Sequence, residues 1–398
     1  MYVPRKISKV VQDACQAFPA VVITGPRQSG KTTFLREEFG QEYHYVTFDE
    51  PLQRQFARED PNGFLDQFVD KPVILDEIQY VQELFSYIKI RIDNNRHLYG
   101  QFLMTGSQQF NLMKNISDSL AGRIAVFELL PFSSEELFSQ NKKRTIQELI
   151  WYGGYPELLL HPESRQTWIS SYIHTYIERD IRQLMNVRDL GQFEQFVTLL
   201  AANFGQELNL SRLSRSTGLS VTGCKKWVYL LNSAYLTYTL QPYYNNFGKR
   251  LVKTPKLYFL DTALAAYLTR QPSLEAAWQG AMGGTFFEGW IITDFRKQLI
   301  SEGIEPNMYF WRSRDGVEVD LILEMNNQII PVEIKQTSTP NTGHTKGLQK
   351  FCRFTDSKCH SGLLVCNIPE KKQLPHGIEA IPWWELKTRV LEVLKRSC

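Results

Sequence analysis

The sequence predicts an α/β protein whose amino-terminal part is built on a parallel β-sheet. Short apolar runs rich in β-branched residues recur there, and segments with helical periodicity separate them. Alternation of strand and helix is typical of parallel sheets with helices on both faces. The runs expected to form strands are Val21–Thr24, Tyr43–Phe48, Val73–Ile78 and Phe102–Ser107.

Length and composition bound the class of protein. A chain of 398 residues exceeds what one hydrophobic core usually organises, so we expect three domains at 1–150, 151–275 and 276–398. Neither a signal pattern nor an apolar run of about 20 residues is present, which predicts a cytoplasmic protein without membrane contact. Six cysteines are scattered without C-x-x-C pairs, and we interpret them as reduced thiols.

The segment after the first strand has the spacing G-x-x-x-x-G-K-T, which is the phosphate loop of nucleotide-binding proteins. Glycines let the backbone turn with its N–H groups facing an anion, and the following helix N-terminus adds partial positive charge. Lys31 would reach the β- and γ-phosphates of ATP, and the Thr32 hydroxyl would bind Mg²⁺. The alternative is a tight turn that happens to contain Gly-Lys-Thr. The predicted nucleotide-binding residues are Gly25, Pro26, Arg27, Gln28, Ser29, Gly30, Lys31, Thr32 and Thr33.

The third strand ends in two acids, as expected beside a phosphate loop. Asp76 would hold Mg²⁺ through water, and Glu77 would polarise the attacking water. Solvated acids at a strand end are the alternative. The next strand would end beside the same site, because ligands bind beyond the carboxyl ends of parallel strands. Thr105 or Ser107 there would sense the γ-phosphate or position the water.

Arg123 is a candidate arginine finger, because it follows a glycine in the segment after the fourth strand. Such an arginine stabilises charge in the transition state, either in cis or from a neighbouring subunit, so a homo-oligomer is possible. A surface arginine is the alternative. Arg27, inside the phosphate loop, is a weaker candidate for the same role.

The segment from Gly205 to Lys256 has the pattern of a winged helix-turn-helix and concentrates positive charge. It contains eight lysines and arginines but one acid. Two expected helices flank Gly218–Ser220, and a strand and a basic turn at 247–256 follow. In this fold the second helix enters the major groove and the wing contacts phosphates. We therefore predict contact with duplex DNA, with a protein contact or a regulatory lid as the alternative.

The last third contains a predicted hairpin that carries charged residues within apolar strands. Period-two geometry places Glu333 and Lys335 on one face, and the hairpin brings Asp320 close to Glu333. Two carboxylates suit Mg²⁺ and phosphodiester chemistry, with Glu288 completing the shell and Lys335 steering or deprotonating water. An amphipathic hairpin is the alternative. A site is favoured because charges in an apolar strand are costly unless they are paired or bind metal.

Taken together, these motifs resemble a family of prokaryotic ATPases that join an AAA/STAND-type P-loop domain to a module catalogued as domain of unknown function 4143. The resemblance implies an ATPase core, a winged helix, and an α/β fold like PD-(D/E)XK nucleases in the last third. Val319 precedes Asp320 where the name of the nuclease signature has proline. The matching segments are Gly25–Thr33, Leu75–Ile78, Thr105–Ser107, Ser119–Arg123, Leu130–Phe132, Gly153–Pro156, Tyr258–Asp261 and Val332–Lys335.

Two functions fit this reading. In the first, the chain hydrolyses ATP and acts on DNA, with Asp320, Glu333 and Lys335 cleaving a strand when the nucleotide state allows it. In the second, the chain is a regulatory nucleotide switch whose C-terminal module is catalytically inactive and binds a protein or nucleic acid.

Overall fold

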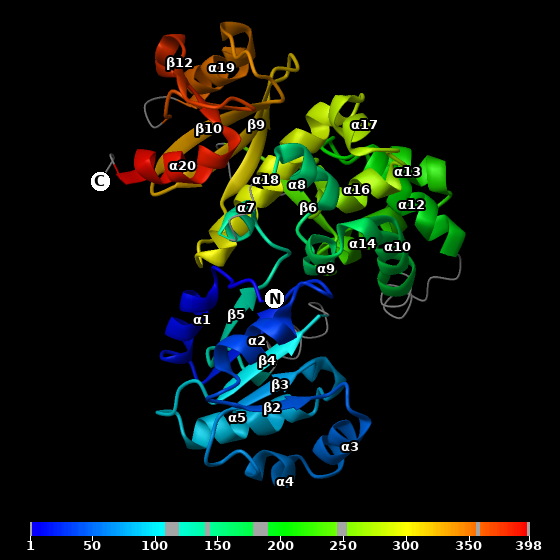
Figure 1. Cartoon of the computed structure of the whole chain (residues 1–398), viewed down its shortest axis with the longest axis vertical. Coiled ribbons are helices and arrows are strands. Elements are labelled where there is room, and N and C mark those ends of the chain that lie inside the picture. The colour runs from blue at the N-terminus through cyan, green and yellow to red at the C-terminus, as the bar shows by residue number, and fades with distance from the viewer. Residues whose placement is uncertain are drawn as a thin grey trace.

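The computed structural model describes residues 2–107, 119–139, 144–177, 190–244, 253–355 and 359–395. In these ranges the chain forms an amino-terminal α/β body and a larger body that contains a helical region and a second sheet (Figure 1). No helix in these ranges combines the length and the apolar composition that a membrane crossing needs.

The first sheet is parallel and five-stranded, in the order β2-β3-β4-β1-β5. Thr24 at the end of β1 lies opposite Gly106 of β4 and Glu128 of β5. The carboxyl ends of these strands therefore meet at one edge, and the predicted α/β class with a parallel sheet is confirmed. The strands are β1 Ala20–Thr24, β2 His44–Thr47, β3 Val73–Asp76, β4 Phe102–Gly106 and β5 Ile124–Glu128.

Helices cover both faces of this sheet (Figure 1). Alternate residues of a strand point to opposite faces, so Val21 and Ile23 join the core beneath α1 and α2 while Val22 joins the core beneath α4 and α5. The helices are α1 Ser8–Cys15, α2 Lys31–Phe39, α3 Pro51–Glu59, α4 Pro61–Asp66, α5 Leu84–Asn94 and the 3₁₀ turn Ile78–Tyr80.

The second sheet is mixed and eight-stranded, in the order β12-β13-β11-β10-β9-β8-β6-β7. The predicted hairpin is its β9–β10 pair, in which Val332 lies opposite Leu321. Asn326 and Asn327 form the turn with φ of 47° and 62°, the left-handed two-residue turn that matches the twist of a hairpin. The strands are β6 Thr237–Pro242, β7 Lys256–Phe259, β8 Met308–Arg312, β9 Glu318–Met325, β10 Gln328–Lys335, β11 Leu363–Cys366, β12 Lys372–Gln373 and β13 Glu379–Pro382.

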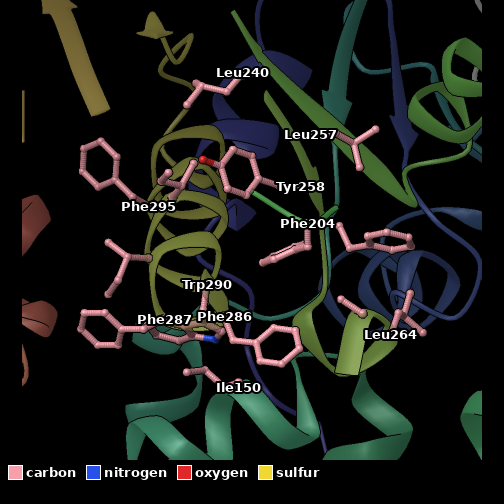
Figure 2. Close-up of a cluster of buried hydrophobic side chains, with 14 of the residues drawn as sticks. Ile150, Phe204, Leu240, Leu257, Tyr258, Leu264, Phe286, Phe287, Trp290 and Phe295 are labelled. Atoms are coloured by element: carbon pink, nitrogen blue, oxygen red, sulfur yellow. The ribbon is translucent and has the colours of Figure 1, made fainter. Parts of the chain in front are cut away.

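One hydrophobic core runs through the helical region and the second sheet, from Phe132 to Leu394. Figure 2 shows its centre, where Phe286 and Trp290 of α18 lie near Phe204 and Tyr258. The helices are α7 Ser134–Phe138, α8 Ile146–Tyr152, α9 Pro156–Leu160, α10 Arg165–Tyr172, α12 Leu190–Ala202, α13 Leu210–Thr217, α14 Val221–Ser233, α16 Thr262–Leu268, α17 Leu274–Gln279, α18 Gly283–Ser301, α19 Lys346–Thr355 and α20 Leu386–Lys395.

The boundary expected near residue 275 does not separate two cores. Strand β6 pairs with β7 on one side and, through Gln241 and Pro242, with β8 on the other. Helix α18 is buried on nearly every side, as a helix in the middle of a large core must be. Residues 151–275 and 276–398 therefore share one sheet and one core.

The helix-turn-helix elements expected in the basic segment are present. Asn209 caps α13 and Ser220 caps α14, each by accepting a backbone N–H with its side chain. Gly218 closes α13 in the left-handed conformation, with φ of 75°. The antiparallel β6–β7 pair follows. Lys249 and Arg250, which the predicted wing includes, lie outside the described residues.

Candidate functional site

The predicted phosphate loop runs from the end of β1 to the first turn of α2, and its backbone needs its glycines. Gly25 and Gly30 have φ of 145° and 93°. A Cβ at Gly25 would lie 2.3 Å from the carbonyl oxygen of Leu129, so a larger residue cannot occupy this position. Gln28 adopts φ of 60° without being glycine, the kind of strained conformation that clusters at functional sites. The Ser29 hydroxyl braces the loop by donating to the carbonyl oxygen of Pro26 at 2.9 Å.

Lys31 is buried within the loop that it follows. Its Nζ donates to the carbonyl oxygens of Gly25 at 3.1 Å and Pro26 at 2.8 Å. Burial lowers the pKa of Lys31 to about 8, against the opposing effect of Glu77 and Asp76. The ammonium group is therefore held across the loop at the position from which it would meet a phosphate.

Asp76 is the centre of a hydroxyl cluster at the carboxyl ends of the strands. It accepts hydrogen bonds from Thr32 Oγ1 at 3.0 Å, Thr105 Oγ1 at 2.5 Å and the Tyr45 hydroxyl at 2.9 Å. Carboxylate and hydroxyl oxygens are ligands that suit Mg²⁺, so the predicted pair Thr32 and Asp76 fits that ion. Tyr45 was not predicted, because its strand pattern gives no sign of which neighbour it meets.

Glu77 follows Asp76 and has an unusual backbone conformation. Its φ of 58° is left-handed, and its N–H donates to Thr105 Oγ1 at 2.9 Å. Its carboxylate accepts from Gln79 and, at 3.4 Å, from the buried Ser107 hydroxyl. The structure thus brings Glu77, Ser107 and the phosphate loop together, as the sequence predicts.

A cavity of about 380 Å³ lies over the loop, and part of its wall comes from the helical region. Tyr172 ends α10, and Thr175 lies in the π-helical turn Ile173–Ile177 that follows. Neither residue was among the predicted site residues. A π turn inside a helix often marks a functional site, but no sequence pattern announces it. The lining residues are Arg27, Gln28, Gly30, Lys31, Thr32, Thr33, Glu77, Tyr172 and Thr175.

Arg5 holds the phosphate loop to neighbouring segments by hydrogen bonds. Its guanidinium donates to the carbonyl oxygens of Ser29 at 2.9 Å and Leu130 at 2.6 Å, and to Glu136 Oε1 at 2.9 Å. Arg5 and Glu136 are both buried, and no local pattern predicts a contact across 131 positions.

Tyr235 connects the helix-turn-helix to the strand that precedes the loop. It follows α14 directly, is buried, and has φ of 58°. Its hydroxyl lies 2.8 Å from Thr24 Oγ1, and Thr24 is the residue before Gly25. One hydrogen bond therefore joins the residue before the phosphate loop to the segment that follows α14.

Arg123 lies at the opposite edge of the first sheet. It precedes β5, which runs parallel to β1, so about five residues of strand at about 3.3 Å each separate it from the level of the phosphate loop. Its guanidinium pairs with Asp93 at 2.8 and 3.2 Å. This position does not suit an arginine finger in cis, and a role from a neighbouring subunit stays a prediction.

A second group of charged residues lies where α18, β7, β9 and β10 meet. We call this group the acidic centre; its members are Glu288, Glu318, Asp320 and Glu333 with Lys256 and Lys335. Lys335 Nζ lies 3.2 Å from Asp320 Oδ2 and 2.7 Å from Glu333 Oε1, and the Ile334 N–H donates to Asp320 at 2.8 Å. Burial favours the neutral amine of Lys335, but Asp320 and Glu333 outweigh it and raise the pKa of this lysine. Lys335 therefore stays an ammonium group and suits steering of water better than deprotonating it.

Glu288 does not complete a shell with the hairpin acids. Its carboxylate accepts from Lys256 at 3.1 Å and from the Tyr258 hydroxyl at 2.7 Å. Burial raises its pKa, and the positive charge of Lys256 opposes that rise. In the part of the chain that the structure describes, no three acids, histidines or cysteines form a group that could hold a metal.

One carboxylate oxygen of Glu333 could nevertheless bind a cation. Its Oε2 is buried and has no hydrogen-bond partner, which is rare for a carboxylate oxygen. Burial, followed by the nearby charge of Asp320, raises the pKa of Glu333 to about 8. The pair Asp320 and Glu333 therefore fits a hard cation by the chemistry of its donors.

The basic segment is only partly a surface. Lys256, counted as part of the predicted DNA contact, is 4% exposed and pairs with Glu288 and Glu318; that assignment was wrong, because every side chain of β7 is buried. The polar side of α14 is exposed and contains Thr222, Lys225, Lys226 and Tyr229. The basic residues that remain exposed are Arg212, Arg215, Lys225, Lys226 and Lys253.

Comparison with known proteins matches three family models along the chain. Residues 17–138 match an AAA domain, residues 143–275 match domain of unknown function 8612, and residues 283–386 match domain of unknown function 4143. The chain is 30% identical over 337 residues to an uncharacterised protein of Mycobacterium tuberculosis, covering 81% of this chain and 71% of that protein.

One further relative and one solved structure extend this comparison. An uncharacterised protein of Methanocaldococcus jannaschii is 22% identical over 408 residues, which covers 92% of this chain and 87% of that protein. A Walker-type ATPase of Pyrococcus abyssi has 14% identity and a TM-score of 0.44, over 66% of this chain and 94% of its own.

Proposed function

The chain belongs to the family that joins an AAA-type P-loop ATPase domain to domain of unknown function 4143, and from this premise we propose that it hydrolyses MgATP in order to act on DNA. The observation that carries the proposal is the convergence of Lys31, Asp76 and Glu77 at one edge of the first sheet.

Each of these residues has a defined task in hydrolysis. Lys31 neutralises the β- and γ-phosphates, and Thr32 and Asp76 would hold Mg²⁺, which supplies electrophilic stabilisation of the phosphate oxygens when bound. Glu77 accepts a hydrogen bond from a water in line with the γ-phosphate and takes its proton as that water attacks. Ser107, hydrogen-bonded to Glu77 at 3.4 Å, orients the carboxylate.

Two observations support an action on DNA. The exposed side of α14 carries Lys225, Lys226 and Tyr229, side chains that pair with phosphates and stack on bases. A replication initiator protein, DnaA of Campylobacter jejuni, is 31% identical to this chain over 122 residues, which is 26% of the chain. Tyr235 connects α14 to the phosphate loop, so that DNA affinity responds to the bound nucleotide.

The acidic centre supplies the chemistry on DNA in this proposal. Asp320 and Glu333 would hold a divalent cation that activates water toward a phosphodiester, and Lys335 stabilises the charge that develops on the phosphate. Incubation of plasmid DNA with the protein, ATP and Mg²⁺ or Mn²⁺ tests this. Cleavage by the wild type that Asp320→Ala abolishes is the expected result.

The same assay addresses the alternative function. If plasmid stays intact with ATP, with ADP and without nucleotide while ATP is still hydrolysed, the C-terminal module binds rather than cuts. The chain would then act as a nucleotide switch. If Lys31→Ala hydrolyses ATP at the wild-type rate, the assignment of the nucleotide site itself is wrong.

A further inference from the structure

Lys256 is the most deeply buried cation of the acidic centre, and none of the roles above uses it. It is 4% exposed, and its ammonium group contacts Glu288 at 3.1 Å and also Glu318. Tyr258, two residues along the same strand, donates to Glu288 at 2.7 Å. Strand β7 therefore carries two side chains that hold one carboxylate.

When all of its acids are ionised, the charges of the centre do not balance without a further cation. The acids Glu288, Glu318, Asp320 and Glu333 pair with Lys256 and Lys335, and Glu318 also lies 4.0 Å from Arg312, which pairs in turn with Glu207. If all are ionised, the group carries two negative charges in excess. An uncompensated charge in a buried site is strongly unfavourable, and one divalent cation would neutralise this excess.

The hairpin carries the two carboxylates, Asp320 and Glu333, that would hold that cation. Glu333 is 7% exposed, and its Oε2 has no partner. Gly347, at the start of α19, faces this oxygen: a Cβ there would come within 3.3 Å of Oε2 and 2.3 Å of the Glu318 carbonyl oxygen. Only glycine lets the helix approach so closely, and it leaves Oε2 without a covering side chain.

We propose that Lys256 is the resident counter-cation of the acidic centre, and that it holds Glu288 and Glu318 so that one divalent cation at Asp320 and Glu333 completes the centre. This rests on the proposed function of the centre. It separates the two acids that Lys256 holds from the two acids that would bind metal. Lys256 is thus a positioning residue, and it lies at the end of the segment predicted to contact DNA.

The test is a comparison of two buried lysines. Lys256→Met removes the resident cation, and Lys387→Met is the matched control. Lys387 is 8% exposed and also bridges two glutamates, Glu135 and Glu302, but it has no contact with the acidic centre. Both variants lose stability without metal, because each removes a buried cation that two carboxylates share.

The response to Mn²⁺ distinguishes Lys256→Met from Lys387→Met. We expect Mn²⁺ to bind Lys256→Met about tenfold or more tightly than the wild type, by calorimetry, because a repelling charge is gone. Mn²⁺ should also raise the Tm of Lys256→Met more than it raises the Tm of the wild type. The rise for Lys387→Met should equal the rise for the wild type. If Lys256→Met does not fold, Lys256→Gln keeps a polar group there and is expected to shift the affinity in the same direction.

The outcomes also separate this proposal from the function of the centre. Mn²⁺ binding by the wild type that the Lys256 variants leave unchanged or weaken overturns the role of Lys256 alone. An absence of Mn²⁺ binding in the wild type and in both Lys256 variants overturns the metal centre together with it.

Discussion

Substitution of Arg5 by methionine tests how much the buried pair of Arg5 and Glu136, which adjoins the phosphate loop, contributes to stability. The change keeps an apolar stem of similar length and removes three hydrogen bonds of 2.6 to 2.9 Å. It leaves Glu136 charged and unpaired, with only 3% of its side chain exposed. Breaking a buried ion pair in this way costs about 3–5 kcal/mol. We expect a loss of that size in the free energy of unfolding.

Urea denaturation of four proteins measures this. They are the wild type, Arg5→Met, Glu136→Gln and the double variant, and the cycle should give a coupling energy of at least about 1.5 kcal/mol. Arg91→Met is the control, because its pair with Asp66 is more exposed and should contribute about 1 kcal/mol or less. A loss below about 1 kcal/mol in Arg5→Met, or an absence of coupling, would refute the reasoning.

The pH dependence gives the same experiment a second readout. Burial opposes ionisation of Glu136, but Arg5 and the hydrogen bonds around it outweigh burial and lower its pKa. A lowered folded-state pKa stabilises the protein above the ordinary value of 4.5, and that contribution is lost as the pH falls through the folded-state pKa. Without Arg5, only the hydrogen bonds from Ser133 and Lys6 oppose burial, so the pKa of Glu136 should rise and the cost of Arg5→Met should shrink as the pH falls from 8 to 5.

Three other outcomes follow from the site. Glu77→Gln should bind ATP but lower kcat by about a hundredfold or more, and wild-type turnover would disqualify Glu77 as the base. Because the pKa of Lys31 is lowered to about 8, affinity for a fluorescent ATP analogue should fall as the pH rises above 8, and Lys31→Arg should remove this dependence; a flat wild-type profile contradicts it. Replacing Lys225 and Lys226 by alanine should weaken DNA binding and reduce the slope of log affinity against log salt by about two, while Lys372→Ala should leave both unchanged.

The phosphate loop and its strands could be predicted because local rules determine them. Gly25 has no room for a Cβ, Lys31 begins helix α2, and Asp76 ends strand β3. Arg5 and Tyr172 could not be predicted, because each reaches the site from a distant part of the chain and its neighbours in sequence carry no sign of it.

The acidic centre could be predicted only in part from the sequence. The alternation along the hairpin correctly placed Asp320 beside the Glu333 and Lys335 pair. Lys256 was assigned to the surface because a count of charges contains no information about the direction in which a side chain points. In β7 all positions are buried, so alternation cannot distinguish an inner face from an outer one.

The pairing of β6 with both β7 and β8 determines how the molecule can be taken apart. Truncation to residues 276–398 would leave the edge of β8 bare and would remove packing partners of α18 such as Phe204, which contacts Phe286. Thermal melting should accordingly show two cooperative units, the ATPase body and everything after it, rather than three. Activity assigned to the last third must therefore be measured on the whole chain, since a fragment that aggregates would be mistaken for one that is inert.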